Sequence, residues 1–101
     1  MNPNLIRQAQ QLQAKLAKAQ QELTEMTLEV STGGGAVKVV IDGKQQVRSL
    51  AISPDVISAG DMELLQDMIT AGMNEAIQRS QEMATDHLSK LTGGLNIPGL
   101  F

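Results

Sequence analysis

The chain has almost no aromatic residues and no cysteine: its 101 residues include no Cys, no Trp, no Tyr and a single Phe. The lack of cysteine excludes a disulfide scaffold, a thiolate zinc site and a cysteine nucleophile, and it fits a reducing compartment. Because stacking on aromatic side chains is how most single-strand and RNA-binding modules hold bases, those classes are excluded in practice. The longest aliphatic run is only Val39-Val40-Ile41, so we expect neither export nor membrane insertion.

The length predicts a single domain with a thin margin of stability. A chain of this size removes only about 60 to 65% of its unfolded surface from water when it folds. Its hydrophobic content of 42% is that of a globular protein rather than a disordered one. A core shared between two copies would relieve the shortage of buried surface, so we expect a homodimer.

The first 26 residues predict a long amphipathic helix from Leu5 to Met26. Asn2 or Asn4 can cap this helix, and Pro3 is suited to its first turn. Its apolar residues recur with alternating steps of four and three, as in a coiled coil. This Leu seam consists of Leu5, Ala9, Leu12, Leu16, Ala19, Leu23 and Met26. A helix of about 22 residues reaches roughly 33 Å, which overhangs any sheet this chain can form. Part of the seam must therefore contact another helix, from the same chain or from a second copy.

The next segment predicts three antiparallel strands joined as a meander. Period-two alternation marks Thr27 to Ser31, the stretch with Val37, Val39 and Ile41, and the stretch from Gln46 to Ser53. Gly33-Gly34-Gly35 predicts a turn with positive φ, and Asp42-Gly43 predicts a type I′ turn. The parity break between Val47 and Leu50 indicates a bulge, and Pro54 ends the sheet.

A second long helix is predicted from Met62 to about Leu91, with Asp61 as its N-cap and Gly93-Gly94 at its C-terminal end. Eight of its residues fall within roughly 80° of one another and form the face expected to be buried. This helix stripe is Leu65, Ile69, Met73, Ala76, Ser80, Met83, His87 and Leu91. We expect the Leu seam and the helix stripe to form the core and the dimer interface.

The predicted fold class is therefore α+β: a long helix, a three-stranded antiparallel meander and a long helix. We expect residues 1–94 to form one domain and residues 95–101 to form a loose C-terminal tail, because Leu95 to Phe101 lacks periodicity.

The sequence contains few residues that could carry out catalysis. His87 is the only imidazole and lies in the helix stripe, where a half-buried packing residue is expected rather than a general base. Glu82 and Asp86 share a helix face but have no further ligands, and Gly33-Gly34-Gly35 lacks the Lys and helix of a P-loop. We expect a non-enzymatic protein with no cofactor, no metal and no small-molecule substrate.

The charges are unevenly placed along the chain, which carries a formal net charge of −3. Residues 1–26 and residues 27–53 each carry +1, whereas residues 54–101 carry −5. On a helical projection the residues Arg7, Gln11, Lys15 and Lys18 span about 80°, and their centre lies more than roughly 100° from the Leu seam. A solvated face of an ordinary amphipathic helix is the alternative to a binding surface.

With aromatic stacking excluded, the nucleic acid that such a basic edge fits is duplex DNA, held through its phosphates by Lys, Arg and Gln. Arg7, Lys15 and Lys18 are the expected phosphate contacts and Gln11 an assisting hydrogen-bond partner. Arg79 and Lys90 are second-rank candidates because acidic residues surround them. Three cations per chain are few, and a two-fold dimer would double the count.

Several stretches spread over nearly the whole chain resemble the YbaB/EbfC family of bacterial nucleoid-associated proteins. They are Arg7-Gln8-Ala9-Gln10, Leu12-Gln13, Gly33-Gly34-Gly35-Ala36-Val37-Lys38-Val39, Ile52-Ser53-Pro54, Leu64-Leu65-Gln66-Asp67-Met68-Ile69, Asn74-Glu75-Ala76 and Leu91-Thr92-Gly93-Gly94. The glycine-rich segment followed at a distance by Leu-Thr-Gly-Gly is the most specific part. Ser53, where the family usually has Asp, and Gly72, where Ala is common, depart from the pattern.

The resemblance implies a homodimer whose paired helices project like the arms of tweezers and bind duplex DNA in the nucleoid, within the cytoplasm. The family has no short signature for its DNA contacts, so the site residues above rest on charge and helical geometry alone. A different class of function stays open: an acidic, helical adaptor whose amphipathic helices bind a partner protein without binding DNA.

Overall fold

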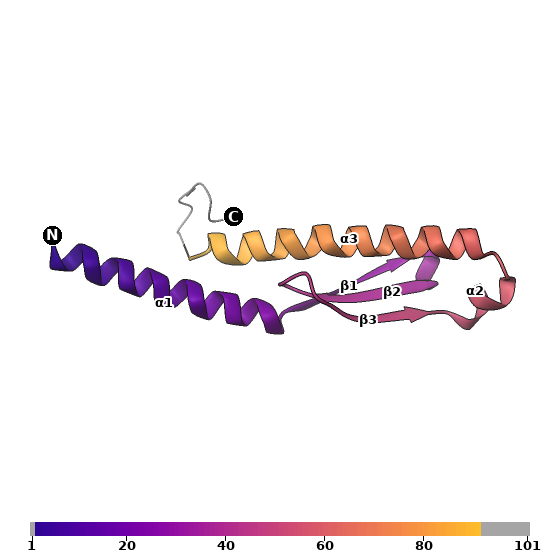
Figure 1. Ribbon diagram of the computed structural model, residues 1–101, viewed down its shortest axis with the longest axis horizontal. Coiled ribbons are helices and arrows are strands. Elements are labelled where there is room, and N and C mark those ends of the chain that lie inside the picture. Colours follow the sequence, from indigo (N-terminus) through magenta and orange to yellow (C-terminus); the bar gives the residue numbers. More distant parts are fainter. Residues whose placement is uncertain (1, 92–101) are drawn as a thin grey trace.

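The computed structural model describes residues 2–91, which form an elongated α+β structure with extents of 68 × 21 × 16 Å. The elements follow in the order α1 (Pro3–Glu25), β1 (Thr27–Thr32), the short 3₁₀ turn η1 (Gly33–Gly35), β2 (Val37–Asp42), β3 (Val47–Ile52), α2 (Pro54–Ala59) and α3 (Met62–Ser89). This arrangement confirms the predicted helix, meander and helix. Helix α1 lies at one end of the molecule and extends past the C-terminal end of α3 (Figure 1). Gly93-Gly94 and the predicted tail 95–101 lie outside the described residues.

Helix α1 begins as its sequence predicts. The side chain of Asn2 accepts a hydrogen bond from the Asn4 N–H at 2.9 Å, and Pro3 occupies the first turn, where its missing N–H costs nothing. No Gly or Pro interrupts the following turns, so the helix continues for 23 residues, or about 34 Å. From Pro3 to Gln11 every residue of α1 is exposed, and the whole helix is called the arm below because this N-terminal part projects from the rest of the structure (Figure 1).

The sheet has the strand order β1-β2-β3, with both pairs antiparallel. The turn at Gly33–Gly35 has the predicted positive φ values, which are 62°, 66° and 96°. The β2–β3 connection is a hairpin, but the predicted type I′ turn is wrong. Its one residue with positive φ is Gln45, at 59°, because the chain takes four residues rather than two to turn.

The predicted bulge lies at Arg48. Val40 pairs with Ser49 while Ile41 pairs with Val47, so Arg48 is left without a partner on β2. A bulge of this kind re-aims the side chain of the extra residue. Here it directs Arg48 toward the C-terminal end of α1.

Helix α2 is not among the predicted elements, although its signals are present in the sequence. The Ser53 side chain accepts a hydrogen bond from the Asp55 N–H, Pro54 takes the first turn, and Gly60 ends the helix in the left-handed conformation with φ of 74°. These are ordinary helix start and stop signals. Only six residues separate them, which is too few for hydrophobic periodicity to appear.

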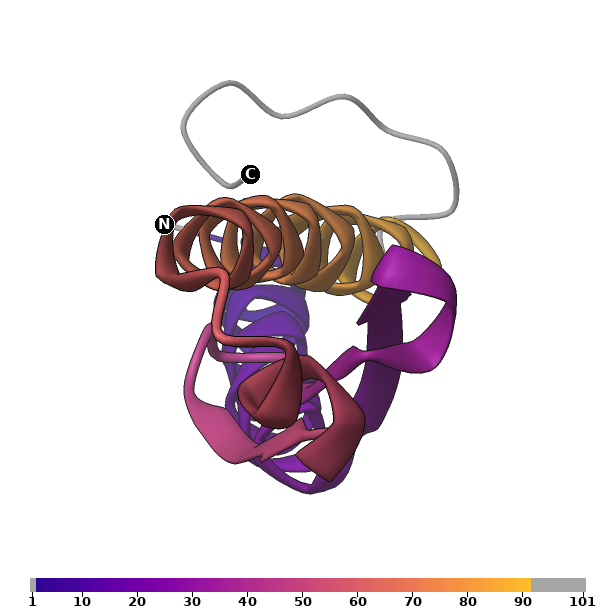
Figure 2. The same ribbon diagram turned by 90° about the vertical axis from the view of Figure 1, so that its right-hand side faces the viewer.

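Helix α3 lies along one face of the sheet (Figure 2) and packs on β1 and β2. Asp61 caps it as predicted by accepting a hydrogen bond from the Leu64 N–H. Every residue of the helix stripe is buried or half-buried, and its first four members, from Leu65 to Ala76, form the core with Val30, Val37, Val39 and Ile41. Among the α3 methionines, Met68 and Met73 pack on this core, whereas Met62 is 66% exposed.

A second, smaller core joins α1 to α3 within the same chain. Ala19 and Leu23 of α1 are buried against Leu88 of α3, with Leu16, Met26, Ala84 and Leu91 packed around them. The C-terminal half of the Leu seam therefore packs on a helix of the same chain, α3. The N-terminal half does not pack in this way, since Leu5 is 60% exposed.

The inner face of β3 is left uncovered. Cross-strand partners share a face, so Leu50 and Val47 lie on the same side as their partners Val39 and Ile41. Val39 and Ile41 are fully buried beneath α3, yet Leu50 and Val47 are 41% and 42% exposed. One copy of the chain thus covers only part of its own sheet.

We expect Gly43→Ala to destabilise the fold by about 1 to 3 kcal/mol, because an added Cβ would meet a well-packed neighbour. That Cβ would lie 2.7 Å from the Leu23 carbonyl oxygen and 2.8 Å from the Leu23 Cδ2 atom. Chemical denaturation at one fixed protein concentration measures the change.

The matched control is Gly72→Ala in α3, where the new Cβ would lie 3.4 Å from the Val39 Cγ2 atom. Because alanine is the better helix former, this variant should gain about 0.5 to 1 kcal/mol. A Gly43→Ala protein as stable as the unmodified chain would contradict the close approach of the hairpin to α1.

Candidate nucleic-acid interface

The four residues predicted on the basic edge of α1 are all exposed. Arg7, Gln11, Lys15 and Lys18 make no side-chain hydrogen bond or ion pair with any residue from 2 to 91. Their positions along the helix span about 16 Å. The arm therefore presents cations whose charge is not neutralised by the described part of the chain.

Lys90, at the C-terminal cap of α3, joins this group. Lys15, Lys18 and Lys90 line one open depression of about 320 Å³, together with Glu22 and Leu91. The sequence placed Lys90 in the second rank because acidic residues surround it. Packing of α1 on the end of α3 instead brings it beside two arm lysines, with Glu22 as the only acidic side chain among the described residues that line the depression.

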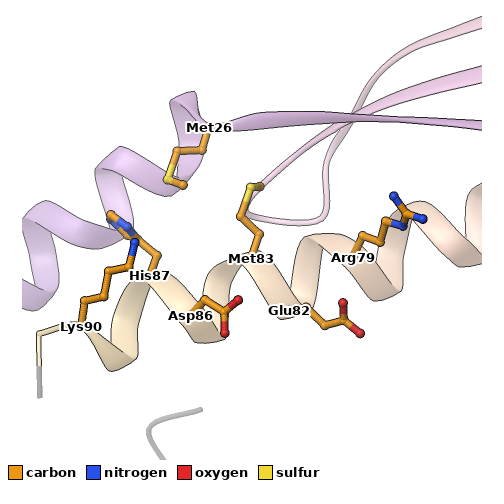
Figure 3. Close-up of a pocket in the computed structure, with 7 residues that line it drawn as sticks. All are labelled: Met26, Arg79, Glu82, Met83, Asp86, His87 and Lys90. Carbon is orange, nitrogen blue, oxygen red and sulfur yellow. The ribbon is translucent and has the colours of Figure 1, made fainter. Parts of the chain in front are cut away.

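Arg79 lies apart from the arm cations, in a second depression of about 550 Å³ (Figure 3). Its guanidinium forms an ion pair at 2.9 Å with Glu75, one helical turn earlier. Glu82 and Asp86 line the same depression, where the side chains of Met26 and Met83 face each other. Lys90 also lines this depression, so the structure separates Arg79 from the cations of α1 but not from Lys90, and Glu75 partly neutralises Arg79.

His87 takes the half-buried position that the sequence predicts. Its Nε2 atom lies 3.3 Å from the Glu22 carboxylate of α1, and its side chain is 22% exposed. Such partly solvated pairs contribute little to stability, about 0 to 1 kcal/mol. The contact links α3 to α1 but is a weak one.

A stronger attachment holds the C-terminal end of the arm to the β2–β3 hairpin. The Gly43 N–H donates to the carbonyl oxygens of Leu23 and Met26 at 2.9 and 3.0 Å. Arg48 donates through Nη2 to the Thr24 carbonyl at 2.7 Å and through Nε to the Asp42 carboxylate at 2.9 Å. Because the last turn of α1 has no basic residue of its own, Arg48 also supplies a cation where the helix dipole favours one.

Asp42 organises this attachment from inside the protein. Its side chain is 1% exposed and accepts hydrogen bonds from the backbone N–H groups of Lys44 and Gln46 as well as from Arg48. The Ser80 hydroxyl of α3 donates to the Asp42 backbone carbonyl at 2.6 Å. One residue therefore connects the hairpin, α1 and α3.

The Asp42 carboxyl group is held in its ionised form. Burial alone would raise its pKa, but the hydrogen bonds from Gln46 and Lys44 and the hydrogen bond and charge of Arg48 outweigh burial. The pKa of Asp42 consequently lies below its ordinary value.

Sequence reasoning does not single out Asp42, Gly43 and Arg48 as residues that hold the arm. In the sequence the dipeptide Asp42-Gly43 indicates only a turn, and Arg48 belongs only to a strand with broken parity. No spacing rule connects them to Thr24, because the contact joins residues 24 positions apart in the chain.

Among residues 2–91 no three His, Cys, Asp or Glu side chains are grouped so that they could hold a metal ion. Within the same range no helix is long and apolar enough to cross a membrane.

The fold and the charged arm define an α+β protein in which an uncovered helix presents cations that no other described residue neutralises. Comparison with known proteins then gives the family: the YbaB/EbfC DNA-binding family matches residues 1–95, and the chain belongs to it. It is 46% identical over 98 residues to a nucleoid-associated protein of Thermoanaerobacter pseudethanolicus, an alignment that covers 97% of this chain and 88% of that protein. It is 48% identical over 99 residues to a nucleoid-associated protein of Acetivibrio thermocellus, with the same coverage.

A solved structure supports the fold independently of close sequence similarity. An uncharacterised protein from Helicobacter pylori superposes with a TM-score of 0.79 at 17% identity, covering 92% of this chain and 99% of that one. The shared fold at such low identity shows that the helix, meander and helix arrangement tolerates extensive change in sequence.

We expect Asp42→Asn to lower the free energy of unfolding at neutral pH by about 1 to 3 kcal/mol, because Arg48 loses its anionic acceptor. The folded pKa of Asp42 is depressed, so the stability it contributes is present above its unfolded pKa, about 3.9, and is lost as the pH falls through the folded pKa. The difference between the two proteins should therefore be constant from about pH 7 to pH 5 and narrow below about pH 4.

Denaturant titrations at a series of pH values measure this difference. The exposed Asp67 has no side-chain hydrogen bond or ion pair in the described residues, so Asp67→Asn is the matched control and should leave the stability nearly unchanged. A stability gap for Asp42→Asn that grows as the pH falls below 4 would contradict the depressed pKa.

Proposed function

We propose that the chain is a non-enzymatic, homodimeric nucleoid protein that binds double-stranded DNA mainly through its phosphates and so affects nucleoid organisation and gene expression. Its place would be the nucleoid, in the cytoplasm. Membership of a DNA-binding family and the names of the relatives support DNA as the partner. The observation that carries the phosphate-contact mode is the row of exposed cations on the outer face of α1, which pair with no residue from 2 to 91.

The proposed contacts are Arg7, Lys15 and Lys18, with Gln11 assisting, Lys90 beside them and Arg79 last. Phosphate contacts by flexible cations position a protein on DNA and carry no sequence information directly. The acidic outer side of α3 would repel the duplex, which confines contact to the arm. Binding of this kind should be weak for one copy and strongly dependent on salt.

Two copies would supply more cations for DNA binding and would also cover the exposed apolar face of β3. A dimer doubles the cations that one duplex meets, and each released counterion adds to the affinity. It could also cover the inner face of β3, where Leu50 and Val47 remain about two-fifths exposed in the single chain. We therefore propose a dimer interface on β3 rather than on the helix stripe, whose first half, from Leu65 to Ala76, already packs on the chain's own sheet.

We expect the triple change Arg7→Ala, Lys15→Ala and Lys18→Ala to weaken DNA binding roughly 10- to 100-fold at low salt. The slope of log affinity against log salt should shrink by roughly 0.9 for each phosphate that the variant no longer neutralises. Fluorescence anisotropy with a labelled duplex at several salt concentrations measures both quantities.

Lys38→Ala is the control, because it removes an exposed cation from β2, away from the arm. It should change neither the affinity nor the salt slope appreciably. If the triple variant bound DNA with the affinity and slope of the unmodified protein, the assignment of the arm as the DNA-binding surface would be wrong.

For the dimer, we expect Leu50→Glu to shift the protein toward the monomer, because a charge would be buried in the proposed interface. Ala51→Glu introduces the same charge on the same strand but on the opposite face, where Ala51 is exposed, and should leave the dimer intact. Sedimentation equilibrium over a range of concentrations distinguishes the two. Dissociation by Ala51→Glu but not by Leu50→Glu would put the interface on the other face.

One observation favours the second candidate function, that of a helical adaptor. An apolar groove of about 280 Å³ lies between η1, α2 and the start of α3, and Val56, Leu64 and Met68 are among its lining residues. If the dimer leaves this groove open, it could hold an apolar segment of a partner protein. An adaptor should recover a stoichiometric protein from nuclease-treated lysate and show no affinity for duplex DNA at low salt.

A further inference from the structure

We propose that Arg48 is the positioning residue that sets the direction of the α1 arm, acting through its simultaneous hydrogen bonds to the Thr24 carbonyl and the Asp42 carboxylate. Its importance for DNA binding rests on the proposed function, but its effect on the arm does not. Arg48 lies on β3 and is not part of the basic edge.

The first reason is where the arm is held. Its residues from Pro3 to Gln11 are all exposed, so they receive no lateral support from the described chain. The direction of the helix is therefore decided at its C-terminal half. For a rod of about 34 Å, a rotation of roughly 10° at the base moves the tip by about 6 Å, close to the spacing of successive turns of a helix.

The second reason is the geometry of the contact. A guanidinium group has donors at fixed angles, so Nε and Nη2 of Arg48 can bind two acceptors in different elements at once. The carboxylate acceptor is buried and is itself held by the Lys44 and Gln46 N–H groups. The Thr24 carbonyl is thus tied to a rigid point of the hairpin rather than to a mobile surface group.

The third reason is that the remaining side-chain contacts at the base constrain direction less. The apolar cluster of Ala19, Leu23 and Leu88 holds the two helices together, but apolar contacts are non-directional. The His87–Glu22 pair is solvated, with the Glu22 side chain 48% exposed. The Gly43 N–H bonds to Leu23 and Met26 are directional, and they come from the same turn that Asp42 organises.

The discriminating variant is Arg48→Lys, which keeps the positive charge but replaces the two-armed donor with a single ammonium group. Because the chain has no cysteine, Gln10→Cys on the arm and Asn74→Cys on α3 allow two nitroxide labels at exposed positions. Diluting labelled protein with excess unlabelled protein restricts the measured distances to one chain. Pulsed electron resonance then reports the width of the distribution of arm-to-body distances.

We expect Arg48→Lys to widen this distribution and to weaken binding of a fixed duplex roughly three- to tenfold at constant salt. Asp42→Asn, which keeps the backbone bonds of the turn but removes the anionic acceptor, should have the same two effects. Lys38→Ala should have neither. Circular dichroism at the assay temperature verifies that each variant is folded, so that a wider distribution reports a freer arm rather than unfolded chains.

An unchanged distribution in folded Arg48→Lys protein would overturn the proposal. If DNA affinity were also normal in Arg48→Lys and weakened in Arg48→Met, that unchanged distribution would identify Arg48 as a simple phosphate contact instead. If the unmodified protein failed to bind duplex DNA at all, the proposed function would fall, and the distance distributions alone would decide whether Arg48 positions the arm.

Discussion

The structure depends on one buried carboxylate. Asp42 ends β2 and accepts hydrogen bonds from two backbone N–H groups of the following turn and from Arg48, while its backbone carbonyl accepts the Ser80 hydroxyl of α3. An ionised group with 1% exposure is tolerable in a protein interior only when it is fully satisfied in this way. The arrangement shapes the hairpin, fastens it to α3 and prepares the surface to which the last turn of α1 binds.

This organisation divides the molecule into a body and an arm that are stabilised in different ways. The body of β1, β2 and α3 buries an apolar core in the ordinary manner. The arm is exposed from Pro3 to Gln11, so apolar packing stabilises it only near its C-terminal end. Polar capping by Gly43 and Arg48 compensates for this limited packing, because directional bonds fix orientation where few apolar neighbours are available. The body also has an apolar surface that no described residue covers, which is the inner face of β3.

The outline of the fold could be predicted from local patterns, and particular residues show why. Asn2, Pro3 and Asp61 act within a few residues of their own positions, so their capping roles are legible in sequence. The bulge at Arg48 disturbs the alternation of its strand and is predictable for that reason. Helix α2 escapes prediction because it is too short to show a hydrophobic period. The turn type at Asp42-Gly43 is predicted wrongly because glycine is required at position 43 by the close approach of Leu23 rather than by a positive φ.

The sequence by itself determined the two long helices and the three strands, the exclusion of disulfide and aromatic chemistry, and the basic edge of α1, since each is a property of composition or of spacing along one helix or strand. Only the tertiary structure decided that Lys90 joins Lys15 and Lys18 and that Arg48 reaches Thr24. The physical reason is that charge and hydrogen bonding act through space. Residues far apart in the chain become neighbours only once the hairpin, α1 and α3 have packed together.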